Sequence, residues 1–457
     1  MNGRVRRALE LAERACHAAD GDQADALAHV ERSGFARFAN SEVHQPTLVQ
    51  DESVSIRVVR DGRLGFSSTN RTDDEGLRAA ARRAGEAADN TPVDPAFAGL
   101  PPPAPVPEVG GFDEETASLT PEDQARTAAA AIEAAREIGL FGYFTSGLVE
   151  TAVVSSVGLA VSQEMTDASL LALAAGDGES GFAEATSWRV GEIDVAAVAR
   201  ASAETAHRTK GAREAEPGTY RAFLAPYALS ELLWYFGFTS LSALAVLEGR
   251  SYLAGRLGDD VFDASFTLVD DALDARGLPK AFDFEGVPKQ RVTIVERGVA
   301  KDVVWDRRTA KRAGDGRVST GHALAPSAQG FGPMAFNLSV EAGDASEAEL
   351  VERVGEGLYV TRLHYLSVVD PREGIVTGMT RDGTFRIEEG RVTTPLVNLR
   401  FTLSVPKLLE RLLGLSGDVT LVNRSDFYGE RYAFGTLVPA SATEAFTIVG
   451  TGSAPGV

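Results

Sequence analysis

The sequence predicts an α+β protein with an N-terminal α/β domain, residues 1–212, and a C-terminal antiparallel, β-rich domain, residues 213–457. Three observations lead to this prediction. The first half contains both helical spacing and strand-like alternation, whereas the second half has short apolar runs between two-residue turn signals. A glycine-bounded break at residues 211–218 separates the two patterns. A chain of 457 residues is long enough for two or three domains.

In the first half, apolar spacing predicts amphipathic helices over residues 5–19, 74–88 and 194–209. A further helix is expected from Thr120, the N-cap, with Pro121 in its first position, to about residue 139. Strands are expected over residues 25–38, broken at Gly34, over residues 53–66 with a hairpin at Asp61-Gly62, and over residues 144–174 with a turn at Val157-Gly158. Seven prolines in residues 91–119 predict an extended, non-helical connector.

The second half begins with a largely apolar segment that predicts one helix over residues 227–247. A late helix is expected over residues 406–415. Between them, turn signals recur at Asp270-Asp271, Glu285-Gly286, Arg297-Gly298, Asp382-Gly383 and Glu389-Gly390. This density of turns is typical of an antiparallel sheet.

Composition excludes several classes of function. With 65 acidic and 45 basic residues the formal charge is −20, which argues against binding to nucleic acid or to an anionic membrane surface. No apolar run approaches the roughly 20 residues that span a bilayer, and the charged first 20 residues do not resemble a signal peptide. The single cysteine, Cys16, allows no internal disulfide. We therefore expect a cytoplasmic protein.

Several segments resemble the TldD/PmbA family of zinc peptidases. They are residues 281–299, the Ser-Thr-Gly-His of 319–322, the strand-like segment 357–364, and in the first half residues 57–70 and 155–159. The resemblance implies a hollow heterodimer of two related subunits that cuts unfolded peptides. Only the TldD-type subunit carries zinc, held by an HExxxH motif on a helix and by a cysteine in a later strand. Two imidazoles and a thiolate hold the metal, and the glutamate acts as general base.

In this sequence the resemblance places other residues at those positions. Trp234 and Thr239 stand for the histidines, Tyr235 for the glutamate and Met379 for the cysteine, and no histidine occurs between Tyr220 and Arg250. A thioether is a poor zinc ligand. The pattern resembles the PmbA (TldE) type of subunit. It implies no catalytic residue and no metal in this chain, and activity in proteolysis or leader-peptide processing only beside a zinc-bearing TldD-like partner.

Two histidines lie in family-like segments, His322 and His364. We expect either a contact with the peptide substrate or, with a carboxylate such as Asp370 or Glu373, an alternative metal site. Two rival functions follow from the sequence. One is a self-sufficient metallohydrolase with a metal near His322 and His364, and the other is a homodimeric peptide-binding protein.

Overall fold

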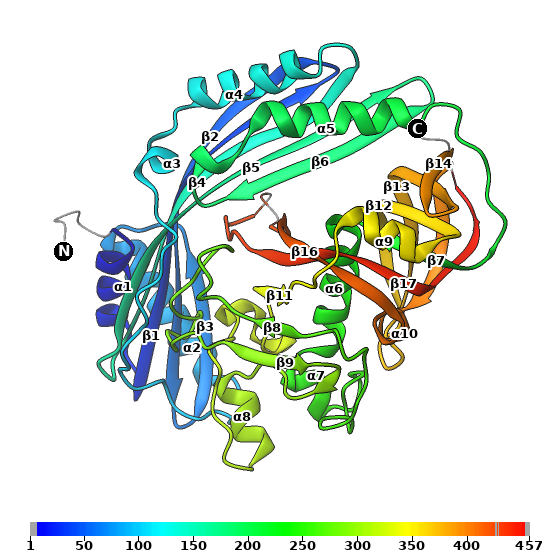
Figure 1. Cartoon of the computed structure of the whole chain (residues 1–457). Coiled ribbons are helices and arrows are strands. Elements are labelled where there is room, and N and C mark those ends of the chain that lie inside the picture. The colour runs from blue at the N-terminus through cyan, green and yellow to red at the C-terminus, as the bar shows by residue number, and fades with distance from the viewer. Residues whose placement is uncertain (1–6, 426, 428, 453–457) are drawn as a thin grey trace.

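The computed structural model describes residues 7–425, 427 and 429–452, which form two sheets with helices around them (Figure 1). The first sheet has six strands in the order β3-β2-β1-β4-β5-β6, and every neighbouring pair is antiparallel. Its strands are β1 (Gln23–Ala39), β2 (Glu42–Arg60), β3 (Arg63–Thr69), β4 (Gly139–Ser155), β5 (Ala160–Gly176) and β6 (Glu179–Ser187).

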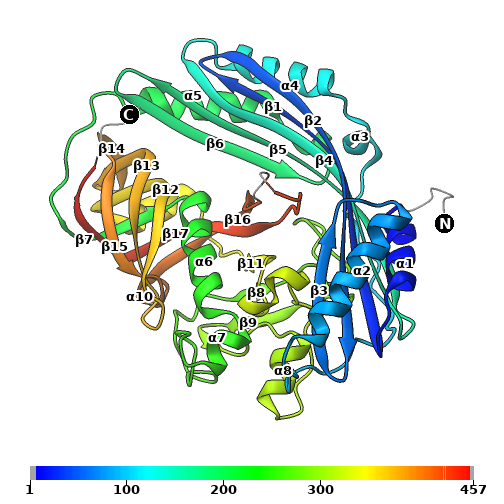
Figure 2. The same cartoon turned by 180° about the vertical axis from the view of Figure 1, so that it is seen from behind.

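Helices cover the outer face of this sheet, while its inner face turns toward the second sheet (Figures 1 and 2). Two apolar clusters hold them there, one beneath α1 and α2 and the other beneath α4 and α5. The helices are α1 (Arg7–Ala18), α2 (Asp74–Asp89), α3 (Glu114–Ser118), α4 (Pro121–Ala134), the 3₁₀ turn η1 (Val190–Glu192) and α5 (Val195–Arg208). The long strands bend, so the sheet arches around the rest of the molecule.

The second sheet contains a closed ring of strands. Strand β7 pairs with both β12 and β17, so that β7, β12, β13, β15 and β17 surround a common core. The strands are β7 (Gly218–Leu224), β8 (Leu268–Asp270), β9 (Val292–Glu296), β10 (Val299–Ala300), β11 (Leu338–Val340), β12 (Gly357–Asp370), β13 (Ile375–Glu388), β14 (Arg391–Leu396), β15 (Leu399–Ser404), β16 (Leu412–Asn423) and β17 (Gly435–Thr451).

One apolar helix packs against the ring. Helix α6 lies along β12 and β17 and buries Leu229, Leu232, Leu233 and Phe236 in the large core. The helical segments of this half are α6 (Pro226–Ser240), α7 (Ala243–Leu247), α8 (Arg307–Ala313), the 3₁₀ helix η2 (Pro326–Phe331), α9 (Glu347–Val354) and α10 (Val405–Glu410). No helix among the described residues is long and apolar enough to cross a membrane.

The α+β prediction is confirmed, and the local signals placed several elements correctly. Asp61 and Gly62 have φ values of 49° and 73° and join β2 to β3, as expected for a two-residue hairpin turn. Thr120 caps α4 in a capping box with Asp123. The division into residues 1–212 and 213–457 stays a prediction. The last helix of the first half ends at Arg208, and β7 begins at Gly218.

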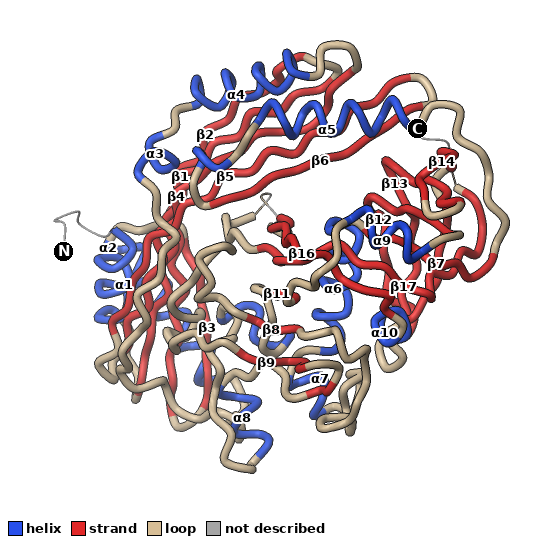
Figure 3. Tube along the Cα trace, viewed as in Figure 1, coloured by secondary structure: helices blue, strands red, loops and turns tan. Residues whose placement is uncertain are grey.

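Two predictions for the first half were wrong. Strand β1 continues through Gly34, because the absence of a side chain there makes room for Gln124 of α4, whose amide atoms lie 2.0 Å from where a Cβ would be. The connector 91–119 is loop except for the short helix α3 (Figure 3), which Asp113 caps by accepting a hydrogen bond from the Thr116 amide.

The second half also differs from the sequence prediction. The expected helix 227–247 is two helices, because residues 241–243 leave the helical path and bond to the backbone of Val304. Asp382-Gly383 forms a bulge inside β13 and not a hairpin. The helix predicted over 406–415 is the shorter α10, and its remaining residues belong to β16. Two strand pairs, β7 with β12 and β11 with β17, are parallel.

Candidate functional site

The side chains at the expected zinc positions are engaged in packing. The Trp234 ring lies 5.2 Å from that of Phe434 and 6.2 Å from that of Phe336. The buried Thr239 hydroxyl donates to the carbonyl oxygen of Tyr235, 3.0 Å away, within its own helix. These contacts are those of a helix fitted into a core.

Tyr235 and Met379 stand at the other two positions that the resemblance assigns to the zinc site. Burial and the neighbouring Glu231 raise the pKa of the Tyr235 phenol above its ordinary value. Met379 lies in β13, opposite His364 of β12. Zinc sites are built from imidazole, thiolate and carboxylate ligands. An indole, a phenol, a hydroxyl and a thioether do not fit the zinc that the resemblance implies at these positions in the TldD-type subunit.

His322 lies in a buried hydrogen-bond network. Its Nε2 is 2.8 Å from Asp270 Oδ1, and its Nδ1 is 2.9 Å from Thr320 Oγ1. Only 1% of the residue is exposed. Burial and the charge of Lys289 lower the pKa of the imidazole. The His322 imidazole is therefore held by its partners in the interior, and a contact with substrate or metal stays a prediction.

The segment 281–299 builds the junction between the two halves. Glu285 accepts a hydrogen bond from the buried Arg57 of β2, 2.9 Å away, and Arg57 is also bound by Asp25 of β1. The nearby Asp283 carboxylate accepts bonds from backbone amides, including that of Ala323, and burial raises its pKa. The motif therefore positions the arched sheet against the second half.

His364 occupies a different place, on a pocket between the two sheets. It is half-buried, and burial together with the cations Arg362 and Arg381 lowers the pKa of its imidazole. The pocket has a volume of 250 Å³. Its lining residues are Tyr143, Leu171, Phe182, Glu184, Tyr227, Glu231, Arg362, Leu363, His364, Asn423, Arg424 and Ser425.

Ionisable groups dominate this His364 pocket. Burial raises the pKa of the Glu184 carboxyl to about 7, against the opposing effect of Arg424. Glu231 of α6 pairs with Arg424, and Arg362 pairs with Asp382 at 2.6 Å. The pocket is therefore lined both by a carboxyl group whose pKa burial raises to about 7 and by an imidazole. Such groups can hydrogen bond to a peptide backbone or terminus.

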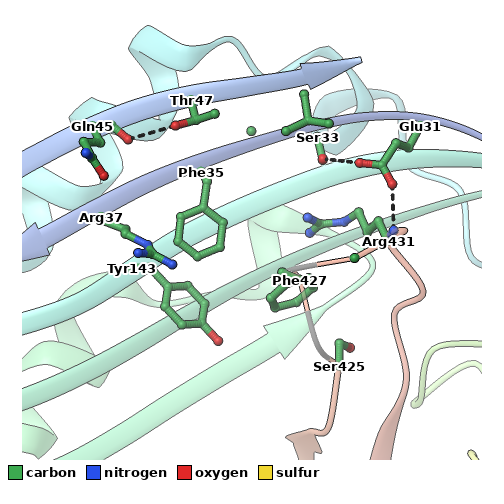
Figure 4. A pocket seen from close by; sticks show the side chains of 13 residues that line it. Glu31, Ser33, Phe35, Arg37, Gln45, Thr47, Tyr143, Ser425, Phe427 and Arg431 are labelled. Atoms are coloured by element: carbon green, nitrogen blue, oxygen red, sulfur yellow. Dashed lines mark hydrogen bonds between the residues drawn. The ribbon is translucent and has the colours of Figure 1, made fainter. Parts of the chain in front are cut away.

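A second pocket adjoins the first and shares Tyr143 and Ser425 with it. It has a volume of 380 Å³ and lies between β1, β2 and β4 on one side and the segment after β16 on the other (Figure 4). Its inner end is held by Arg431, whose backbone amide donates to Glu31 over 2.6 Å. The two pockets form one candidate site between the sheets.

The structure does not bring His322 and His364 together into a metal site. His322 is bonded to Asp270 and Thr320, whereas His364 lines the pocket between the sheets. Asp370 accepts hydrogen bonds from the backbone amides of Arg372 and Glu373 in its own turn. Within residues 7–425, 427 and 429–452, no three His, Cys, Asp or Glu side chains are grouped so that they could hold a metal ion.

Sequence reasoning missed most of the site. Glu184, Glu231, Arg362, Arg424 and Arg431 come from β6, α6, β12 and the segment after β16. Their spacing along the chain carries no motif, so only the folded arrangement brings them together. The one available signal was the unusual isolation of Glu231 within the apolar helix α6, whose sequence is otherwise free of charged residues.

Comparison with known proteins agrees with this architecture. Residues 217–450 match the model of the PmbA/TldA metallopeptidase C-terminal domain, which is more than half of the chain, and residues 24–88 match domain 1 of the same family. This chain belongs to the PmbA/TldD metallopeptidase family. The family membership that the sequence motifs predicted is therefore confirmed.

Curated relatives in the family match over part of their length. An uncharacterised protein of Methanocaldococcus jannaschii is 27% identical over 59% of this chain and 63% of its own. A metalloprotease of Methanothermobacter thermautotrophicus is 30% identical over 38% of each chain. A zinc metalloprotease TldD homologue of Saccharolobus solfataricus is 28% identical over 44% of this chain and 45% of its own. The chain thus spans less than two thirds of each of these relatives.

Solved structures share the whole fold of this PmbA/TldD family member. TldE from Thermococcus kodakarensis superposes with a TM-score of 0.83 at 21% identity, over 96% of this chain and 99% of that one. A Thermotoga maritima chain, described as a candidate modulator of a DNA gyrase, gives a TM-score of 0.82 at 19% identity, over 93% and 96%. At these identities the likeness establishes the fold alone.

Proposed function

We propose that this chain is the non-catalytic subunit of a metallopeptidase and acts on unfolded peptides beside a zinc-bearing TldD-like partner in the cytoplasm. The observation that carries the proposal is the occupation of the expected zinc positions by packed side chains, with Trp234 against Phe434 and Thr239 bonded to its own helix. A chain with neither metal ligands nor the base at these positions cannot activate water there in the way the family's catalytic subunit does.

In this proposal the chain contributes walls and contacts for the peptide. The His364 pocket supplies a half-buried imidazole and the Glu184 carboxyl, and extended backbone can pair with strand edges through hydrogen bonds that tolerate many sequences. The same contacts suit proteolysis of small unfolded proteins and removal of leader segments.

The test is peptide cleavage by this chain alone, by a TldD-like partner alone and by their mixture. We expect chelator-sensitive cleavage only in the mixture, and none when the partner's motif glutamate is replaced by glutamine. Robust cleavage by this chain alone would refute the proposal.

One variant examines the contribution of this chain to the substrate site. His364→Ala in the mixture should raise KM by roughly tenfold, because the imidazole lines the pocket. His17→Ala, on the exposed face of α1, is the matched control and should leave KM unchanged. Equal KM values for the two variants would exclude a substrate contact by His364.

A further inference from the structure

Half of strand β2 has a strand neighbour on one side only. Strand β1 pairs with β2 from Glu42 to Val59, but β3 pairs only with Val54 to Arg60. Among the described residues, no strand or isolated bridge covers the other side of residues 42–53. An uncovered strand presents a row of backbone N–H and C=O groups that another extended chain can pair with. We call residues 42–53 the open edge.

The protection usual for such strands is concentrated around Pro46, and the open edge is regular from Thr47 to Ser53. Leu48 and Val49 are 42% and 41% exposed. Lysine commonly blunts exposed edges, yet residues 42–53 contain no lysine or arginine. Glu42 and Asp51 are acidic, while Glu52 is already paired with Arg7 over 2.8 Å. At Gln45 and Pro46 the edge is blunted, because Gln45 has a φ of 47°, Pro46 has no N–H to donate, and the register with β1 shifts. The remaining stretch suits a neutral or basic strand.

The open edge borders the pocket of Figure 4. Gln45, Thr47 and Val49 all line this pocket, and in the regular part of β2 Thr47 and Val49 face the same side of the sheet. Thr47 lies opposite Phe35 of β1, and Val49 lies opposite Ser33. A strand added outside β2 would therefore direct every second side chain toward the pocket.

Three aromatic rings form the apolar wall of the pocket. The rings of Phe35 and Tyr143 lie 4.8 Å apart, and that of Phe427 lies 6.4 Å and 6.1 Å from them. The guanidinium of Arg37 lies 5.2 Å from the Phe35 centroid, and that of Arg431 lies 4.6 Å from the Phe427 centroid. Such a wall favours an aromatic or large aliphatic side chain.

Buried polar contacts fix Arg431, which lies against the Phe427 ring of this wall. Arg431 is 3% exposed and binds Asp167 through two hydrogen bonds, and its Nη1 donates to Thr145 over 3.0 Å. Its side chain lies across Gly147, where a Cβ would be 2.3 Å from Nε. The Arg431 side of the pocket is therefore held in place before any ligand arrives, which lowers the entropy cost of binding.

We propose that a neutral or basic extended peptide adds as a strand to the open edge and places one aromatic or large aliphatic side chain in the pocket of Figure 4. The proposal rests on the proposed function for the nature of the ligand, an unfolded peptide. A second copy of this chain fits the edge less well. Antiparallel pairing of two whole edges would place Glu42 of each copy diagonally across from Asp51 of the other.

The binding test uses the full chain and a capped, fluorescein-labelled heptapeptide of alternating threonine, valine and lysine with one central phenylalanine. Affinity is measured by fluorescence anisotropy. Replacing the phenylalanine by alanine should weaken binding about tenfold or more, because the aromatic burial is lost. Methylating single peptide nitrogens should weaken binding at alternate positions only, because alternate N–H groups face the open edge.

Protein variants locate the site. Thr47→Trp should fill the pocket from its exposed rim, whereas Phe427→Ala should remove one ring of the apolar wall. Each variant should weaken peptide binding about tenfold. Phe331→Ala removes an aromatic side chain that is 63% exposed and outside the pocket, so it should bind like the wild type. Thermal unfolding of each variant establishes that it is folded. Two independent pocket variants keep the test decisive if one of them is unstable.

Three results would overturn the inference. One is equal affinity for the phenylalanine and alanine peptides, and another is wild-type binding by both Thr47→Trp and Phe427→Ala. The third is a homodimer that Thr47→Trp converts to monomer, with no peptide bound, since a second copy then covers the edge. Binding to the chain alone is independent of cleavage. If the peptide binds as described but the mixture with a TldD-like protein cleaves nothing, the proposed function fails and the open-edge site stands.

Discussion

Arg431 and Asp167 are 264 positions apart in sequence and joined by two parallel hydrogen bonds, 2.8 Å from Nε to Oδ1 and 2.6 Å from Nη2 to Oδ2. Both side chains are 3% exposed. Asp167 belongs to β5 of the arched sheet and Arg431 to the segment between β16 and β17. The pair therefore fastens the second half of the chain to the inner face of the first.

Breaking this pair should destabilise the protein strongly. Asp167→Asn leaves the Arg431 guanidinium buried without its counter-charge, and we expect a loss of about 3–5 kcal/mol in the free energy of unfolding, measured with urea. Arg431→Gln combined with Asp167→Asn should lose less than the sum of the single changes, because the two residues interact directly.

The control for this experiment is Glu133→Gln on α4. Its partner Arg136 and Glu133 itself have 72% and 74% of their side chains exposed. Exposed pairs contribute little, so the change should stay below about 1 kcal/mol. A loss for Asp167→Asn no larger than that for Glu133→Gln would contradict the proposed fastening.

Glu184 should make stability depend on pH. Burial raises the pKa of its carboxyl from 4.5 to about 7, so the folded protein holds this proton more tightly than the unfolded chain. The stabilisation from the protonated form is complete below about pH 4.5 and is lost as the pH rises to about 7. Glu184→Gln mimics the protonated form. It should be more stable than the wild type by about 1–3 kcal/mol at pH 8, with the difference vanishing near pH 4.5.

Urea unfolding of both proteins across this pH range measures the difference. Other buried carboxyls with raised pKa values, such as Asp283, are present in both proteins and cancel. A constant difference between Glu184→Gln and the wild type from pH 4.5 to pH 8 would show that Glu184 titrates as an ordinary carboxyl.

Metal analysis examines the zinc positions directly. After dialysis against a weak chelator, the purified chain should retain no stoichiometric zinc, because Trp234, Tyr235, Thr239 and Met379 supply none of the usual ligands. The TldD-like partner, treated in the same way, serves as the positive control. About one zinc per molecule of this chain would contradict the prediction and favour a metal site that includes His322 or His364.

The assembled complex should bind extended peptides in preference to folded domains. The backbone groups of a folded domain are already paired, whereas an unfolded segment can pair with strand edges. A peptide scanned with proline should bind more weakly at alternate positions, because each such proline removes an N–H donor. With the partner inactivated at its motif glutamate, affinities are measured for the peptide set and for the same sequence within a folded protein. Equal binding of both forms would exclude strand addition.

Local signals in the sequence predicted much of the fold. Asp61-Gly62 and Thr120-Pro121 succeeded because a turn or a helix start depends on neighbouring residues. The predicted strand break at Gly34 was wrong because it depends on a residue that is remote in the sequence. The feature that explains it is Gln124, which lies 90 positions away in sequence and fills the space above Gly34 in the fold. A glycine that makes room for a distant side chain cannot be told from one that ends a strand.

The candidate site was predictable only in part. His322 and His364 both lie in family-like segments, but one is bonded to Asp270 in a sealed interior and the other lines a pocket. Burial gives the two imidazoles different surroundings, and burial depends on the packing of segments that are remote in the chain. Arg431 carries no sequence signal at all, since its partners Asp167 and Glu31 belong to the other half.

The ring of strands constrains the order in which the protein can form during synthesis. Strand β7 starts at Gly218 and pairs with β17, which ends at Thr451, so the ring can close only after β17 has left the ribosome. The arched sheet, complete by Ser187, can form much earlier. Before β17 has been synthesised, the apolar helix α6 lacks part of its packing surface, and exposed apolar surface of this kind makes an incomplete chain prone to aggregation.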